Sequence, residues 1–250
     1  MIVIDVGNTE TVIGFYKKKK LIKIDRFITK EKNLKKKLIY FLHKNKVINI
    51  KSKNKICIIA SVVPKINKSI FSLFKDHNFN TLNINTRNTN KILISKYLAP
   101  ELGADRIANS VAAIKKYGKD SIVIDFGTAT TFDVIKNRIY EGGSIAPGIN
   151  ISHDALVNNA SKLKKISIKK IKSVVGVNTR ESMQSGFYWG YIGLINEIIN
   201  RIIIEKNFQP KIILTGGLAK IFRNEINFKN YHEPNLTLDG LYHIGILYYG

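Results

Sequence analysis

The sequence predicts an α/β protein made of two similar halves, each with a mixed β-sheet flanked by helices. An apolar strand that ends in Asp and is followed by Gly occurs twice, 120 residues apart, at Ile2–Gly7 and Ile122–Gly127. Two further strands, separated by a short polar turn, follow each copy. Alternating helices and strands then follow each three-strand meander. A repeat on this scale indicates a duplicated structural unit.

The first half contains the first meander and then alternating elements. Further strands are expected at residues 11–16, 21–27, 55–63 and 81–84. Helices are expected at residues 33–46, 66–74 and 103–117, where apolar side chains recur every three or four positions. Gly118 is a typical helix-ending residue. We therefore expect a first domain at residues 1–117.

The second half repeats this plan. Strands are expected at residues 130–135, 139–145 and 211–215, and helices at residues 148–163, 179–206 and 237–248. These elements form a predicted second domain at residues 118–250. A chain of 250 residues with 44% hydrophobic residues is long enough to build both cores.

The composition indicates a protein of the cytoplasm. No apolar run approaches the ~20 residues that a membrane-spanning helix needs. The N-terminus enters a strand directly, without the basic and apolar regions of a signal peptide. The only cysteine, Cys57, lies in an apolar strand, so no disulfide can form within one chain.

The charge is strongly positive, with 41 Lys and Arg against 18 Asp and Glu, a net charge of +23. Such a charge can indicate a nucleic-acid partner. The lysines are instead spread over predicted turns and helix faces, without interleaved aromatic residues. This distribution favours solvated surfaces, so we expect neither a nucleic-acid nor a membrane partner. The positive field still attracts small anions.

The two strand-end turns have the residues of a phosphate-binding site. Asp5 and Asp125 can each hold or order a cation, and the glycines let backbone N–H groups approach an anion closely. Either copy alone is equally well explained as an ordinary strand ending. The matched pair favours a site that binds a polyphosphate through both turns.

Four short motifs occur in order along the chain: Asp5–Thr9, Gly103–Arg106, Asp125–Thr131 and Thr215–Ala219. Together they resemble the type III pantothenate kinases, and the resemblance extends over essentially the whole chain. It implies two duplicated ribonuclease-H-like domains in the actin-like ATPase fold. It also implies transfer of the γ-phosphate of ATP to pantothenate, which gives 4'-phosphopantothenate in the first step of coenzyme A biosynthesis.

The resemblance implies the ATP site and its cations. The residues expected to contact ATP are Asp5, Val6, Gly7, Asn8, Thr9, Glu10, Thr11, Val12 and Thr128. Asp5 would order Mg²⁺ indirectly, and Asp125 would hold a monovalent cation, K⁺ or NH4⁺. Glu10 stands where the family usually has a neutral residue. The Gly216-Gly217 pair resembles an adenosine-side loop, although a simple strand-to-helix turn explains it equally well.

The acceptor site centres on Asp105, the expected general base. Taken alone, Gly103–Arg106 is more simply explained as a helix N-cap followed by a surface arginine. The other motifs favour a catalytic role for Asp105. The resemblance places these residues around pantothenate: Tyr97, Gly103, Ala104, Asp105, Arg106 and Thr179. Tyr97 read alone is more often a packing residue.

The predicted helix at residues 179–206 carries two apolar stripes, one through Phe187 and Ile198 and the other through Tyr188 and Ile199. Two stripes imply burial on two sides. Its own domain can cover both, but the resemblance implies a homodimer in which Thr179 completes the partner's site.

Two other functions remain possible from the sequence. A phosphatase of the same fold, acting on polyphosphate or nucleotides, would release phosphate whether or not pantothenate is present. A non-catalytic regulator that binds nucleic acid would keep that binding at physiological salt. The residues in family register at the acceptor site argue against the first, and the three aspartates argue against the second.

Overall fold

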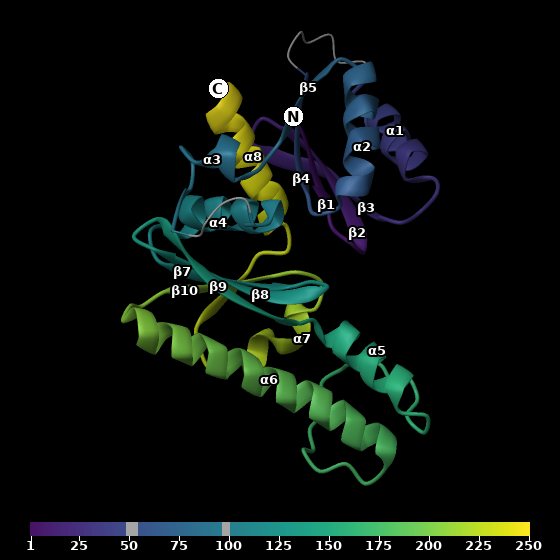
Figure 1. The fold of residues 1–250 in the computed structure, drawn as a ribbon, viewed down its shortest axis with the longest axis vertical. Coiled ribbons are helices and arrows are strands. Elements are labelled where there is room, and N and C mark those ends of the chain that lie inside the picture. The colour runs from purple at the N-terminus through teal and green to yellow at the C-terminus, as the bar shows by residue number, and fades with distance from the viewer. Residues whose placement is uncertain (49–54, 97–100) are drawn as a thin grey trace. The chain divides into compact units, whose positions relative to one another are not determined.

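The computed structural model describes residues 1–48, 55–96 and 101–250, and it contains two compact units (Figure 1). Unit 1 comprises residues 1–116 and 235–250, and unit 2 comprises residues 117–234. The last helix, α8 (Leu236–Tyr249), therefore packs in unit 1, although the sequence pattern grouped it with residues 118–250. Its Gly245 lies close against Met1 and Ile58, a contact between distant parts of the chain.

Unit 1 is built on a five-stranded mixed sheet with the strand order β3-β2-β1-β4-β5. Its strands are β1 (Ile2–Val6), β2 (Glu10–Lys17), β3 (Lys20–Ile28), β4 (Lys55–Ser61) and β5 (Phe79–Asn83). Strands β1, β2 and β3 form an antiparallel meander, while β4 and β5 run parallel to β1.

The two faces of this sheet are covered by different helices. Ile2 and Ile4 of β1 share a core with α1 and α2, while Val3 points to the opposite face, towards α8. Because side chains alternate along a strand, Asp5 shares the face of Val3. The remaining elements of the unit are α1 (Leu34–Lys44), α2 (Pro64–Asp76), α3 (Thr86–Thr89), β6 (Ile94–Ser95) and α4 (Ala104–Tyr117, whose last residue is counted in unit 2).

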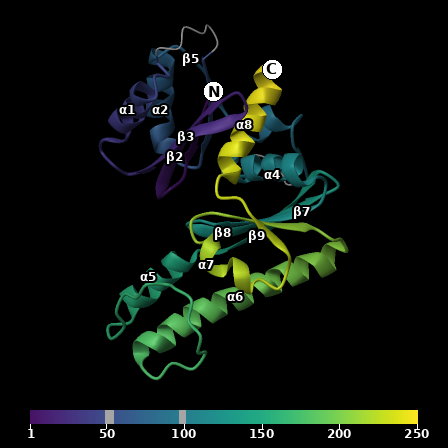
Figure 2. The same ribbon diagram turned by 180° about the vertical axis from the view of Figure 1, so that it is seen from behind.

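Unit 2 has the strand order β9-β8-β7-β10-β11. Its strands are β7 (Ser121–Phe126), β8 (Ala129–Lys136), β9 (Ile139–Pro147), β10 (Lys211–Thr215) and β11 (Asn230–His232). Its helices are α5 (Ile149–Asn159), α6 (Thr179–Lys206), α7 (Ala219–Phe222) and the short 3-10 helix η1 (Arg223–Glu225). Helix α6 runs along one face of the sheet and shares its core (Figure 2).

The five strands of unit 1 and the five strands of unit 2 have the same topology. Each has an antiparallel meander followed by two parallel strands. The Asp-Gly turns at residues 5–9 and 125–129, which we call the first and second phosphate turns, each join the first two strands. Even the hairpin turns match, since Lys18-Lys19 and Asn137-Arg138 both adopt positive φ angles at two consecutive residues. That conformation matches the twist of the flanking strands. The duplication predicted from sequence is confirmed.

Most predicted elements are present, and α6 and β10 begin and end where the sequence predicts. The helix predicted at residues 148–163 ends earlier, at Asn159, and residues 160–178 form no helix or strand. The short elements α3, β6, α7 and β11 are additions that the sequence pattern did not reveal. Among the described residues, no helix has the length and hydropathy that crossing a bilayer requires.

Candidate active site

The first phosphate turn joins β1 to β2 in a tight reversal. The Gly7 N–H donates to the Glu10 carbonyl oxygen at 2.9 Å, and Thr29 Oγ1 donates to the Gly7 carbonyl oxygen at 2.7 Å. A Cβ at position 7 would lie only 3.0 Å from that Glu10 oxygen, so glycine suits the turn. Asn8 and Thr9 are exposed at its tip, and Asp5 is half-buried just before it.

The residues after the turn differ in exposure. Thr11 is fully buried, and its hydroxyl oxygen lies 2.9 Å from that of Thr29, so Thr11 supports the turn from within. Val12 is also buried. Glu10 is exposed and forms an ion pair with Arg26 at 3.1 Å. The unusual negative charge at position 10 is therefore partly offset by a neighbouring cation.

The second turn occupies the equivalent place in unit 2 and is one residue shorter. The Gly127 N–H donates to the Ala129 carbonyl oxygen at 3.1 Å, and Thr128 is exposed. Asp125 precedes the turn on β7, opposite Thr215 of the parallel strand β10. By strand alternation, Asp125 points away from the α6 face, as Asp5 points away from α1 and α2 in unit 1.

Two glycines pack directly against this second turn. Gly216 follows β10 with a φ of +86°, and a Cβ there would lie 2.6 Å from Asp125 Oδ1. Gly148 forms the N-cap of α5, and a Cβ there would lie 2.2 Å from the Thr128 carbonyl oxygen. The start of α5 and the end of β10 therefore meet the backbone of the turn. The role of Gly148 was not apparent from the sequence, because this contact joins segments 20 residues apart.

Asp105 lies in the first turn of α4. Its Oδ1 accepts a hydrogen bond of 2.8 Å from the Arg106 N–H, and a Cβ at Gly103 would lie 2.5 Å from the same oxygen. Burial raises the pKa of Asp105 above its ordinary value, and the Arg106 N–H and guanidinium partly oppose this shift. The absence of a side chain at Gly103 leaves room for the Asp105 carboxylate. This steric requirement explains the glycine of the Gly103–Arg106 motif.

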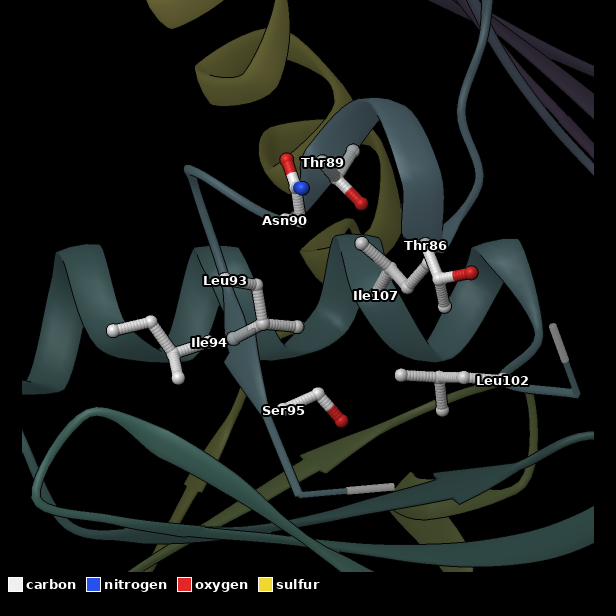
Figure 3. A pocket seen from close by; sticks show the side chains of 8 residues that line it. All are labelled: Thr86, Thr89, Asn90, Leu93, Ile94, Ser95, Leu102 and Ile107. Carbon is white, nitrogen blue, oxygen red and sulfur yellow. The ribbon is translucent and has the colours of Figure 1, made fainter. Parts of the chain in front are cut away.

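A pocket of about 260 Å³ lies on the side of α4 that faces α3 (Figure 3). Its walls are mostly apolar, with a few hydroxyl and amide groups. The residues that line it are Thr86, Thr89, Asn90, Leu93, Ile94, Ser95, Leu102 and Ile107. In sequence, Leu102 and Ile107 flank the predicted acceptor segment 103–106. The pocket is therefore next to the segment expected to bind pantothenate.

The other described acceptor residues lie on two helices, Arg106 on α4 of unit 1 and Thr179 on α6 of unit 2. Arg106 is buried in α4, and its carbonyl oxygen accepts a hydrogen bond of 2.8 Å from Ser110 Oγ. Thr179 is exposed at the start of α6, whose N-cap Asn178 accepts a hydrogen bond of 3.0 Å from the Glu181 N–H. Tyr97 lies outside the described residues.

Comparison with known proteins decides the family. The family model of type III pantothenate kinases matches residues 1–201. The chain belongs to the type III pantothenate kinase family. A type III pantothenate kinase of Pelagibacter ubique is 41% identical to it over 96% of both chains, and one of Persephonella marina is 39% identical over 96% of both.

The fold agrees with that family. The structure of MreB5 of Spiroplasma citri bound to ADP aligns with 98% of this chain and 96% of its own, with a TM-score of 0.53 and 12% identity. At this identity the likeness concerns the fold alone. The predicted actin-like ATPase fold of two mixed sheets flanked by helices is confirmed.

The aspartates next to the two turns, Asp5 and Asp125, belong to different units. The described residues contain no group of three or more His, Cys, Asp or Glu side chains that could hold a metal ion together. Mg²⁺ is commonly bound by one or two carboxylates together with the phosphates of a substrate. Asp5, half-buried beside the first turn, offers one carboxylate for that mode of binding.

Proposed function

We propose that this protein is an ATP-dependent pantothenate kinase that forms 4'-phosphopantothenate, the first product of coenzyme A biosynthesis. The observation that carries the proposal is a matched pair of Asp-Gly phosphate turns on equivalent strands, in a chain of the type III pantothenate kinase family. Because ATP is a cytoplasmic substrate, the cytoplasm is the proposed place of action.

The first turn is the proposed contact for the phosphates of ATP, through Asp5, Val6, Gly7, Asn8, Thr9, Glu10, Thr11 and Val12. Its exposed tip and the close packing at Gly7 suit backbone contact with an anion. The side chains of Thr11 and Val12 are buried and support the turn, so their proposed contact with ATP is through backbone groups. Bound Mg²⁺ would neutralise charge on the phosphates, and Asp5 would order the water around that ion.

The second turn contributes Thr128, beside the N-terminus of α5. Backbone N–H groups of a first helical turn have no partner within the helix, and the helix dipole favours an anion there. Because Gly148 brings this helix end against Thr128, both can face the same phosphate group. Asp125 is the proposed ligand of a monovalent cation, K⁺ or NH4⁺, next to that group.

Asp105 is the proposed general base, and Gly103, Ala104, Arg106 and Tyr97 are proposed to bind pantothenate around it. The pantothenate hydroxyl oxygen attacks the γ-phosphorus while its proton passes to the Asp105 carboxylate. The new O–P bond forms as the bond from phosphorus to the bridging oxygen of ADP breaks. Burial supports this role, because a raised pKa makes the carboxylate a stronger base.

A homodimer is the proposed assembly, and α6 supports it. Its second stripe is buried in unit 2, whereas Phe187, Leu194 and Ile198 of the first stripe are only half-buried. Beside them, an exposed row of glycines has no atom within 4 Å of an added Cβ: Gly186, Gly190 and Gly193. Glycine inside a helix costs ~0.5–1 kcal/mol relative to alanine. A partner helix that approaches closely at this row would explain the cost.

Thr179 is proposed to act in the partner's pantothenate site, and a mixed dimer tests this. Asp105→Asn and Thr179→Arg are each expected to be inactive. After subunit exchange, each mixed dimer should contain one doubly altered site and one intact site, so activity should return. Verified mixed dimers without activity would exclude the shared site, and a protein that is monomeric in solution would exclude the dimer as well.

A coupled ADP-release assay tests the proposed activity. With Mg²⁺ and K⁺, ADP release is expected to require pantothenate. ATP hydrolysis that is indifferent to pantothenate would instead support a phosphatase. Nucleic-acid binding at physiological salt, together with no kinase activity, would support a regulator.

A further inference from the structure

The segment Leu236–Leu241 at the start of α8 has no assigned role in the reaction, yet three of its residues hold α4. Thr237 Oγ1 donates a hydrogen bond of 2.8 Å to Asn109 Oδ1. A Cβ at Gly240 would lie 1.9 Å from the Ala108 carbonyl oxygen, so the two helix backbones are in direct contact. Asp239 Oδ2 accepts a hydrogen bond of 2.6 Å from Lys116 Nζ. We call Thr237, Asp239 and Gly240 the α8 clamp.

The clamp holds α4 at two places, in its second turn and near its C-terminal end. Asn109 lies one helical turn after Asp105, on the same face of α4, because residues four apart are neighbours on a helix surface. Asn109 is fully buried, so its hydrogen bond with Thr237 is protected from water. Lys116 lies near the other end of the helix. Thr237 and Gly240 therefore hold the second turn of α4, directly after the first turn, which carries the proposed base.

The clamp also reaches the strand that follows the first phosphate turn. Tyr16, on β2, donates a hydrogen bond of 2.5 Å to Asp239 Oδ1. The Tyr16 ring stacks on Tyr242 of α8, with 4.5 Å between ring centroids and 13° between planes. Burial, with the hydrogen bond to Asp239, raises the pKa of Tyr16, so the phenol remains a donor. Asp239 thus binds β2 and α4 at once.

We propose that Thr237 and Asp239 are positioning residues for phosphoryl transfer, which hold the helix of Asp105 in register with the strand of the first phosphate turn. This inference rests on the proposed function, since it assigns Asp105 to the reaction. Both elements belong to unit 1, and α8 packs on β2 and is hydrogen-bonded to α4. Positioning matters because a displacement of about 1 Å can cost ~10²-fold in rate.

Replacing Thr237 tests the proposal. Thr237→Val keeps the side-chain shape and removes the hydroxyl, so kcat for pantothenate phosphorylation should fall at least ~10-fold. KM for ATP should stay within about twofold, because the ATP-binding turn is not on α4. Thr237→Ser retains the donor and should restore kcat. This separation of kcat from KM distinguishes positioning from a general loss of stability.

Thr81→Val is the matched control. Thr81 is half-buried on β5 of the same unit, and its hydroxyl donates a hydrogen bond of 3.3 Å to the Phe79 carbonyl oxygen. This variant loses the same hydroxyl group and should keep kcat within about twofold. Normal kcat in Thr237→Val, or an equal loss in Thr81→Val, would overturn the proposal.

Hydrogen exchange of residues 103–109 separates this inference from the proposed function. The amides of residues 107–109, near the start of α4, should exchange faster in Thr237→Val than in the wild type, and at the wild-type rate in Thr81→Val. Unchanged exchange in Thr237→Val would overturn the clamp. A wild-type protein that does not phosphorylate pantothenate would instead overturn the proposed function, and the exchange rates would still show whether the clamp holds α4.

Discussion

Replacing Asp105 with asparagine should lower kcat and, at neutral pH, raise the stability of the fold. The variant loses the carboxylate that accepts the hydroxyl proton, so kcat should fall while ATP binding stays nearly unchanged. It keeps an oxygen that can accept the Arg106 N–H, which bonds to Asp105 at 2.8 Å in the wild type. That hydrogen bond is therefore preserved, whereas alanine at this position would lose the acceptor.

The expected size of the loss follows from the chemistry. A positioned base is typically worth ~10²–10⁴-fold. Phosphoryl transfer through a loose transition state needs little proton removal, so we expect the low end, ~10²-fold. That corresponds to ~2.7 kcal/mol in activation free energy. The base must be ionised to accept the proton. As pH is lowered, kcat/KM of the wild type should therefore decrease when the pH passes below the raised pKa of Asp105, and this decrease should begin at a higher pH than for an ordinary aspartate.

Stability should change in the other direction at neutral pH. Burial raises the pKa of Asp105 in the folded protein, so the folded state binds its proton more tightly than the unfolded state does. Stability is therefore lost as pH rises from the ordinary aspartate pKa, about 3.9, through the raised value. The neutral Asp105→Asn variant escapes this loss. It should unfold at a higher temperature than the wild type at neutral pH, and the difference should vanish below about pH 4.

Steady-state kinetics with saturating ATP and pantothenate, together with thermal unfolding at two pH values, measure both effects. Asp25→Asn is the matched control, because Asp25 Oδ1 accepts a hydrogen bond of 2.9 Å from the next residue's N–H on an exposed strand. The control should keep normal turnover. Near-normal turnover in Asp105→Asn would refute the reasoning and leave Asp105 as a simple helix cap.

Three other predictions concern the second turn and the dimer. Replacing K⁺ with Na⁺ should lower wild-type activity, and Asp125→Asn should blunt that response; equal activity in both salts would remove the cation site. Gly216→Ala should raise KM for ATP because its Cβ would displace Asp125, whereas Gly118→Ala, with a similar φ of +94° and open space, should cost only backbone strain. Alanine at Gly186, Gly190 and Gly193 should weaken the dimer in sedimentation equilibrium; a dimer of unchanged affinity with a raised melting temperature would show that this row is merely exposed to solvent.

The sequence could predict features that depend on local pattern. The duplicated turns at Gly7 and Gly127 follow from strand, Asp and Gly in the same order, and the strands pair as that repeat requires. The start of α6 follows from the N-cap Asn178 and its hydrogen bond with Glu181, three residues later. These signals lie within a few residues of one another, so they can be recognised without the fold.

Features that depend on distant contacts could not be predicted. Helix α8 packs in unit 1 because its buried face meets Met1 and α4, which lie far away in sequence. The approach of Gly148 and Gly216 to the second turn likewise appears only after the strands pair. The exposed glycines of α6 carry a sequence signal, three glycines at helical spacing within an apolar helix, but their exposure required the structure.

The most direct test of the central claim is to follow the γ-phosphate itself. The wild-type protein would be incubated with pantothenate, Mg²⁺, K⁺ and ATP labelled with ¹⁸O at the γ-phosphate, and the products would be identified by mass spectrometry. We predict labelled 4'-phosphopantothenate in an amount equal to the ADP formed. Labelled inorganic phosphate with no phosphopantothenate would contradict the assignment of this protein as a pantothenate kinase.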